Sequence, residues 1–356
     1  MAIDKNLLLV GSIPLDTAEK VFRACAGAIG NDLFCIPDGE VGERRYWTNF
    51  QCYRVFHGHP DLETVRRPDP RDGVENWHPR GYVDQWQFRV KPGLKAIHFG
   101  DPGWRLGYTR DAVNSYFVFK TLRDKGVIPA GVRFQVCIPL TGSIVEHYFR
   151  NPADYPIVKP AYEQALRDEI AMLCEQIPPS DLAIQFDAAS EILDIQNFYD
   201  WTGNDDKFER QISAVGRVSP QIPSDVMLGY HWCYGTLGGW PITPLESLDL
   251  CTRLSNRAVE LAGRRVDFIH LPVPKERTDE AFYAPLEQLK IGDTKMYLGI
   301  VHHDDEPGGF EKRLHAARQH LEDFGVGSVC GYGRRPESEL PAVLEAHRQA
   351  AAAMRK

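Results

Sequence analysis

The segment Val226-Met227-Leu228-Gly229-Tyr230-His231-Trp232-Cys233 is the most informative about the fold: it is an apolar run that ends with a histidine and a cysteine. Alternate side chains of a β-strand point to the same face, so His231 and Cys233 can both bind one ion. Far along the chain, a second apolar run, Gly325-Val326-Gly327-Ser328-Val329, is followed directly by Cys330. This distant cysteine can complete the site only in a fold that brings strand ends together, as a closed barrel does.

On both sides of this run in the sequence, short β-rich runs alternate with helical stretches. The expected strands are 7–13, 32–37, 132–138, 182–186, 226–230, 266–269, 296–301 and 327–329. The expected helices are 16–29, 160–176, 206–215, 245–262, 280–289, 309–323 and 337–354. Eight such βα units predict an α/β protein with a (β/α)8 (TIM) barrel rather than an open sheet. No G-x-G-x-x-G follows a strand, which argues against a dinucleotide-binding fold.

One interval, residues 41–130 between the second and third strands, breaks this rhythm. Its aromatic residues include Tyr46, Trp47, Phe50, Tyr53, Phe56, Trp77, Trp86, Phe88, Trp104 and Tyr108. Long insertions at the C-terminal face of a barrel usually form lids or pocket walls. The alternative is a helical subdomain with its own small core, and the two interpretations are compatible. We expect one barrel domain over residues 1–356, with 41–130 as an insertion or lid and Trp47 in contact with substrate.

Composition excludes several classes of protein. The 356 residues are 43% hydrophobic and 25% charged, which is ordinary for a globular protein. A net charge of -8 argues against a nucleic-acid-binding surface. No apolar run approaches the roughly 20 residues of a membrane span, and 7–10 is too short for the apolar core of a signal peptide, so we expect a cytoplasmic protein. Eight cysteines are too few for a disulfide scaffold.

Polar residues collect at or just after the expected strand ends, which all face one mouth in a barrel. They are Ser12, Asp38, Glu40, Thr141, Ser143, Asp187, Glu191, His231, Cys233, His270, His302, His303, Asp304, Cys330, Arg334 and Arg335. Thiolate and imidazole ligands favour Zn²⁺, and catalytic zinc sites use three protein ligands and one exchangeable position. His231, Cys233 and Cys330 supply three ligands, and His270 is a candidate fourth.

Five segments resemble motifs of the cobalamin-independent methionine synthases. Residues 10–14 (VGSIP) are similar to the family's G-S-F-P opening, and 37–45 (PDGEVGERR) to its D-G-E-x-x-R segment. Residues 184–187 (IQFD) resemble the start of its Q-I-D-E-P-A motif. Residues 231–235 (HWCYG) resemble its H-x-C ligand pair, and 329–335 (VCGYGRR) resemble the D-C-G-L-K-T-R that supplies its last ligand.

The resemblance implies zinc held by His231, Cys233 and Cys330, with a substrate thiol that attacks a methyl group. It also implies that Ser12, Glu40 and Asp187 hold an amino-acid substrate, and we add Asp38 as a further substrate-binding residue. The chemistry is sound, because a free thiol with a pKa near 8.5 is mostly protonated at neutral pH and coordination to zinc deprotonates it.

The chain departs from the family at two strand ends and resembles it at a third. His270 stands where the family has a glutamate ligand, so it either binds zinc in place of the carboxylate or does not bind at all. Ala188 and Ala189 replace the Glu and Pro on the folate side, which argues against methyl-folate as the donor. His302, or else His303, lies near the position of the family's general acid.

We therefore expect a zinc-dependent enzyme that transfers a methyl or other alkyl group to a small thiol. One alternative is addition of a thiol to an epoxide, as in related transferases of the same superfamily. Another is a zinc lyase or hydrolase that uses metal-bound water, with Asp187 or His302 as base. A last alternative is a non-enzymatic relative that binds a small molecule or a stabilising metal.

Overall fold

The computed structural model describes residues 3–100 and 103–355, and within them eight parallel strands form a nearly closed barrel. In chain order the strands are β1 (Leu7–Leu8), β2 (Cys35–Pro37), β5 (Arg133–Pro139), β6 (Leu182–Ala188), β7 (Met227–Trp232), β8 (Phe268–Pro272), β9 (Lys295–Val301) and β10 (Phe324–Ser328). They are hydrogen-bonded in the order β1-β10-β9-β8-β7-β6-β5-β2. A single bridge from Leu7 to Leu33, just before β2, joins the two ends of the sheet. The predicted (β/α)8 fold is confirmed.

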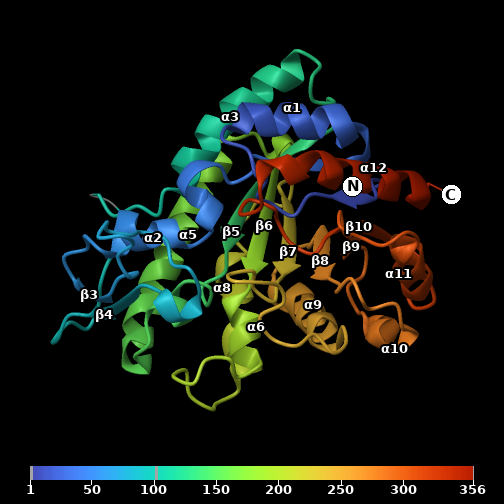
Figure 1. Cartoon of the computed structure of the whole chain (residues 1–356). Coiled ribbons are helices and arrows are strands. Elements are labelled where there is room, and N and C mark those ends of the chain that lie inside the picture. The colour runs from blue at the N-terminus through green and yellow to red at the C-terminus, as the bar shows by residue number, and fades with distance from the viewer. Residues whose placement is uncertain (1–2, 101–102, 356) are drawn as a thin grey trace.

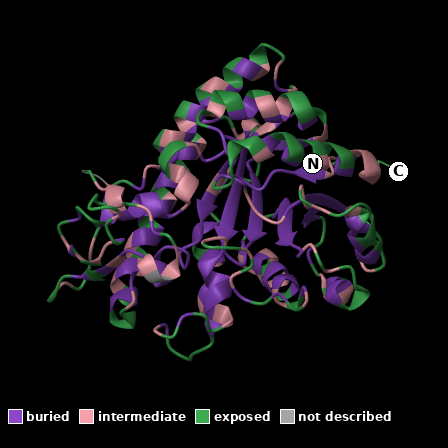
Figure 2. Ribbon diagram, in the orientation of Figure 1, coloured by how far each residue is buried: buried purple, intermediate pink, exposed green. Residues whose placement is uncertain are grey.

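Helices surround the strands, as Figure 1 shows. They are α1 (Ala18–Ile29), α2 (Asn49–Gln51), α3 (Tyr108–Asp124), α4 (Val145–Tyr148), α5 (Tyr155–Gln176), α6 (Ser190–Ile195), α7 (Lys207–Ile212), α8 (Ala214–Val218), α9 (Asp249–Leu261), α10 (Glu280–Tyr283), α11 (Gly309–Arg318) and α12 (Leu340–Met354). The barrel strands are buried except for Arg133 and Cys137 of β5, which are half-buried, whereas the outer helices bury one face and expose the other (Figure 2). None of the helices in the described ranges is both long and apolar enough to cross a membrane.

Strand β1 is much shorter than the predicted 7–13. Beyond Leu8, side-chain amides inside the barrel bind the backbone carbonyls. Gln135 Nε2 donates to the carbonyls of Leu9 and Val10 at 3.1 and 3.3 Å, and Gln185 Nε2 donates to Val10 at 2.6 Å. Because these amides bind carbonyl groups that a neighbouring strand would otherwise bind, the chain leaves the sheet early and turns toward the mouth.

The long interval after β2 carries its own small sheet and then returns to the barrel. Strands β3 (Leu62–Arg66) and β4 (Gln87–Val90) form an antiparallel hairpin, on the opposite side of the molecule from α10 and α11 in Figure 1. Helix α3 packs against α1 and α5, so it takes the position of the barrel helix that follows β2. The aromatic rings of Phe56, Trp86 and Phe88 belong to the same hydrophobic core as the barrel residues.

Candidate functional site

A pocket of about 320 Å³ opens at the C-terminal ends of the strands. This volume lies at the small end of the range for small-molecule sites. The lining residues that carry polar or aromatic side chains include Ser12, Glu40, Tyr46, Trp47, Thr48, Asn49, Tyr82, Gln85, His147, Asp187, His231, Cys233, Thr236, Trp240, Cys330, Tyr332, Arg334 and Arg335. The predicted substrate contact Trp47 therefore lies in the pocket wall, together with other residues of the 41–130 segment.

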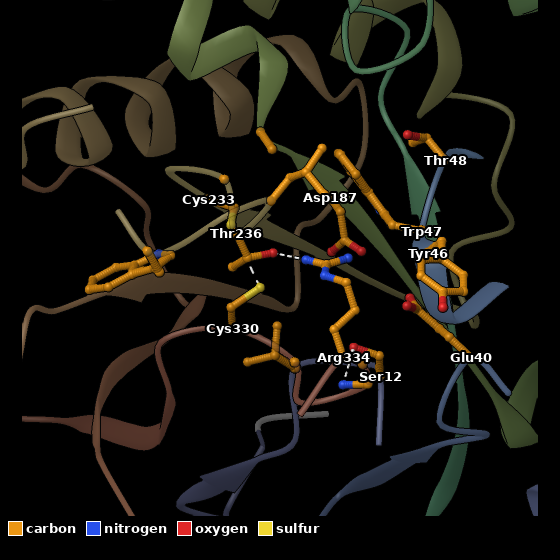
Figure 3. A pocket seen from close by; sticks show the side chains of 18 of the residues that line it. Ser12, Glu40, Tyr46, Trp47, Thr48, Asp187, Cys233, Thr236, Cys330 and Arg334 are labelled. Atoms are coloured by element: carbon orange, nitrogen blue, oxygen red, sulfur yellow. Dashed lines mark hydrogen bonds between the residues drawn. The ribbon is translucent and has the colours of Figure 1, made fainter. Parts of the chain in front are cut away.

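Three of the predicted metal ligands converge in this pocket. The ligand atoms of His231, Cys233 and Cys330 lie within 4.8 Å of one another, and the sulfurs of Cys233 and Cys330 are 3.7 Å apart. Figure 3 shows the two cysteines pointing toward each other. The alternation of strand β7 produces this geometry, because Trp232 lies between the ligands and its Nε1 donates to Ser255 of α9 on the other face.

The chemistry of this group suits a zinc ion. His231 is 2% exposed, and its Nε2 has no hydrogen-bond partner among the described residues. The thiol of Cys233 donates to Cys330, which holds the pKa of Cys330 well below its ordinary range and raises that of Cys233. A buried imidazole nitrogen beside two cysteine sulfurs is the donor set that Zn²⁺ prefers. These residues fit the metal that the sequence predicts.

His270 lies behind His231 instead of beside the sulfurs. The two residues are paired across β7 and β8, and their Nδ1 atoms are 2.8 Å apart. The converging group of ligand atoms contains His231, Cys233 and Cys330 without His270. Whether His270 binds a metal stays a prediction of the sequence.

A second group, of two carboxyls and a thiol, lies in the interior of the barrel mouth. Ligand atoms of Glu40, Asp187 and Cys137 lie within 4.8 Å of one another. Burial raises the pKa of Glu40 to about 8, and burial together with the Glu40 charge raises the pKa of Asp187 well above its usual range. Gln185 Nε2 donates to Asp187 at 2.8 Å, whereas the Glu40 carboxylate has no hydrogen bond within the described residues. Two acids held this close attract a cation.

Asp38 positions Glu40 and does not line the pocket itself. Its carboxylate pairs with Arg44, accepts from Ser115 at 2.6 Å, and accepts from the backbone N–H of Glu40 at 3.0 Å. Glu40 has a φ of +51°, and Gly39 before it has a φ of +81°. A left-handed non-glycine residue is strained, so the hydrogen bond from its N–H to Asp38 stabilises the turn that aims Glu40 into the pocket. Whether Asp38 contacts substrate stays a prediction of the sequence.

We expect Asp38→Asn to lower the free energy of unfolding by about 3 kcal/mol, because the change leaves the largely buried Arg44 charge with only the more distant carboxylate of Asp111, at 3.7 Å. Urea unfolding would measure the loss. The double variant Asp38→Asn/Arg44→Met is the control, and it should lose less than the sum of the two single variants. An unchanged urea midpoint in Asp38→Asn would show that the pair does not hold this turn.

The segment after β10 packs closely on Ser12. A Cβ on Gly331 would lie 2.3 Å from Ser12 Oγ, so only glycine allows this approach. Ser12 Oγ accepts from the backbone N–H of Gly333 at 3.1 Å. Next along the chain, Arg334 extends into the pocket and hydrogen-bonds to Thr236 (Figure 3). The loops after β1, β7 and β10 are thereby joined over the pocket.

The two histidines predicted as proton donors are not among the residues that line the pocket. Burial lowers the pKa of His302 to about 4. His303 Nε2 lies 3.0 Å from the carboxylate of Glu339, and its ring packs edge-on against Tyr332. A catalytic role for either histidine stays a prediction.

Two protic residues of the pocket wall, His147 and Tyr82, were missed by the sequence interpretation. His147 Nδ1 hydrogen-bonds to the hydroxyl of Tyr199 at 2.8 Å, and its ring contacts that of Tyr82 edge-on. The Tyr82 hydroxyl lies against Gly235, just beyond the ligand Cys233. The sequence offers a signal for each residue. His147 comes shortly after Ser143 at a predicted strand end, and Tyr82 lies in the aromatic-rich interval 41–130.

Comparison with known proteins supports the fold. No protein-family model and no curated protein matches the chain. Among solved structures, the B12-independent methionine synthase from Shewanella sp. W3-18-1, in complex with selenomethionine, has a TM-score of 0.58 at 14% identity, over 95% of this chain and 87% of that one. The protein from Listeria monocytogenes assigned as a vitamin-B12-independent methionine synthase has a TM-score of 0.56 at 14% identity, over 95% and 86%. At this identity the likeness shows a shared barrel fold.

Proposed function

We propose that this chain is a zinc-dependent enzyme that transfers a methyl or other alkyl group to a small thiol, as methionine synthases do. The convergence of His231, Cys233 and Cys330 in the pocket carries the proposal. The two solved structures named above, one of them bound to the alkylated amino acid selenomethionine, are consistent with it. Zinc bound there would hold the substrate thiol as a thiolate at neutral pH.

The protein residues supply binding and orientation. Glu40 and Asp187 offer negative charge for an ammonium group of the thiol substrate, and the Ser12 hydroxyl lies at the same mouth. Tyr46, Trp47 and Tyr82 form an aromatic wall suited to an apolar or flat part of the alkyl donor. Since two cysteine thiolates already balance the charge of a Zn²⁺ ion, a thiolate would enter a neutral site more readily than an anionic one.

Cobalt substitution tests this proposal. Adding homocysteine to the Co²⁺-loaded protein should intensify the sulfur-to-cobalt charge-transfer absorption, because the thiol takes the exchangeable position. Homoserine, which carries a hydroxyl in place of the thiol of homocysteine, is the matched control and should leave that absorption unchanged. A hydrolase with metal-bound water would be inhibited by the thiol in an assay of its own substrate. Absence of any spectral response to small thiols would exclude thiol activation. If thiols do change the spectrum, calorimetry with methyl-folate would test whether it is the donor.

A further inference from the structure

The buried pair His231 and His270 constrains the proton positions on both rings. The residues are 2% and 0% exposed, and their Nδ1 atoms lie 2.8 Å apart. At this distance one nitrogen must donate and the other must accept, because two protonated or two bare nitrogens would repel each other. The pair therefore has two states, which differ in the direction of this hydrogen bond.

Only one direction leaves His231 able to bind a metal. If His231 Nδ1 carries the proton and donates, its Nε2 has a free lone pair among the sulfurs of Cys233 and Cys330. If His270 donates instead, the proton of neutral His231 sits on Nε2 and occupies the ligand position. Binding of a metal through Nε2 of His231 therefore requires the first state.

The other end of the His270 ring faces strand β10. A neutral His270 ring carries one proton. If its Nδ1 accepts from His231, that proton is on Nε2. This Nε2 lies against strand β10, where a Cβ on Gly327 would be 3.6 Å away, and it has no hydrogen-bond partner among the described residues.

We propose that His270 is a positioning residue and not a metal ligand: its Nδ1 accepts the Nδ1–H of His231 and so directs His231 Nε2 to the metal. The inference rests on the proposed function only in that a metal binds at this site. The metal then has three protein ligands, and its remaining position stays open to a thiol. Partners of this kind orient histidine ligands in many metal sites, although here the partner is a second imidazole in place of a carboxylate or carbonyl.

X-ray absorption spectroscopy of the zinc-loaded wild-type protein tests the assignment without any substitution. We expect two sulfur scatterers and one imidazole. Two imidazoles would overturn the role of His270 and leave the metal site standing. Zinc without sulfur ligands, or no bound zinc, would overturn both this inference and the proposed function.

The variant His270→Phe keeps a ring of similar size and removes the acceptor. We expect it to retain the same ligand shell and to bind zinc about 10- to 100-fold more weakly in a competition with a chelator. His320→Phe is the matched control, because His320 hydrogen-bonds to Glu287 outside the pocket, and its zinc affinity should equal that of the wild type. Unchanged affinity in His270→Phe, or loss of an imidazole from its ligand shell, would contradict the inference.

Discussion

Replacing Cys330 by serine, or His231 by alanine, should remove bound zinc and thiol alkylation together. The ligand atoms of these residues and of Cys233 meet within 4.8 Å, and a site with two protein ligands holds Zn²⁺ poorly. Without the metal, a thiol with a pKa near 8.5 is only a few per cent ionised at neutral pH, so its ionisation alone accounts for a loss of about 30-fold. Zinc content by mass spectrometry and the rate of thiol alkylation are the two measurements.

Cys251→Ser is the matched control for this experiment. Cys251 is a fully buried thiol on α9 that contacts the Tyr234 hydroxyl at 3.7 Å and does not line the pocket. The control should retain full zinc content and full activity, which would show that losses elsewhere come from the metal site. A Cys330→Ser protein that kept both its metal and its activity would refute the ligand assignment.

The convergence of the three predicted metal ligands could be predicted from the sequence because it follows from the geometry of strands and of the barrel. The two-residue period of a strand places His231 and Cys233 on one face, whatever surrounds them. The eight βα units then place Cys330 at the same mouth, since parallel strands of a barrel end on one side. No knowledge of loop conformation was needed for either step.

The positions of His302, His303 and Asp38 depend on contacts that no local pattern reveals. His302 follows β9 directly, yet it does not line the pocket, and its half-buried ring lies near the charge of Arg313. The carboxylate of Asp38 pairs with Arg44 and accepts a hydrogen bond from Ser115, which lies on a helix far along the chain. The early end of β1 has a similar origin, because it depends on amide side chains from β5 and β6. Sequence position thus located the strand ends but not the direction of each side chain.

The substitution Glu40→Gln should raise the stability of the empty protein in mildly alkaline solution. The pKa of Glu40 is near 4.5 in the unfolded chain and about 8 in the folded protein, where burial disfavours its charge. Between these values the folded state binds more protons than the unfolded state, so the stability of the wild type falls as pH rises from about 4.5 to 8. Glutamine removes this effect. The free energy of unfolding of the variant should therefore exceed that of the wild type by on the order of a few kcal/mol at pH 8 and by almost nothing at pH 4.

The same substitution should weaken binding of ammonium ligands. Methionine is a suitable probe because it carries an ammonium group and no ionisable thiol. Below about pH 8 its ammonium must displace the proton of Glu40, so wild-type affinity should rise up to about tenfold per pH unit and level off above pH 8. Glu40→Gln should bind methionine at least about 30-fold more weakly near pH 8, since one partner of a buried charge pair is lost.

4-(Methylthio)butanoate, which is methionine without its ammonium group, separates charge recognition from a general disturbance of the pocket. Its affinity should be equal in the wild type and in Glu40→Gln, or higher in the variant because a buried negative charge is gone. Calorimetry across pH 6 to 9, a range chosen to bracket the pKa of about 8, would give both affinities. If Glu40→Gln gained stability without losing methionine affinity, Glu40 would be a strained buried acid with no part in substrate binding. If it lost affinity for both ligands alike, the pocket and not the charge would have changed.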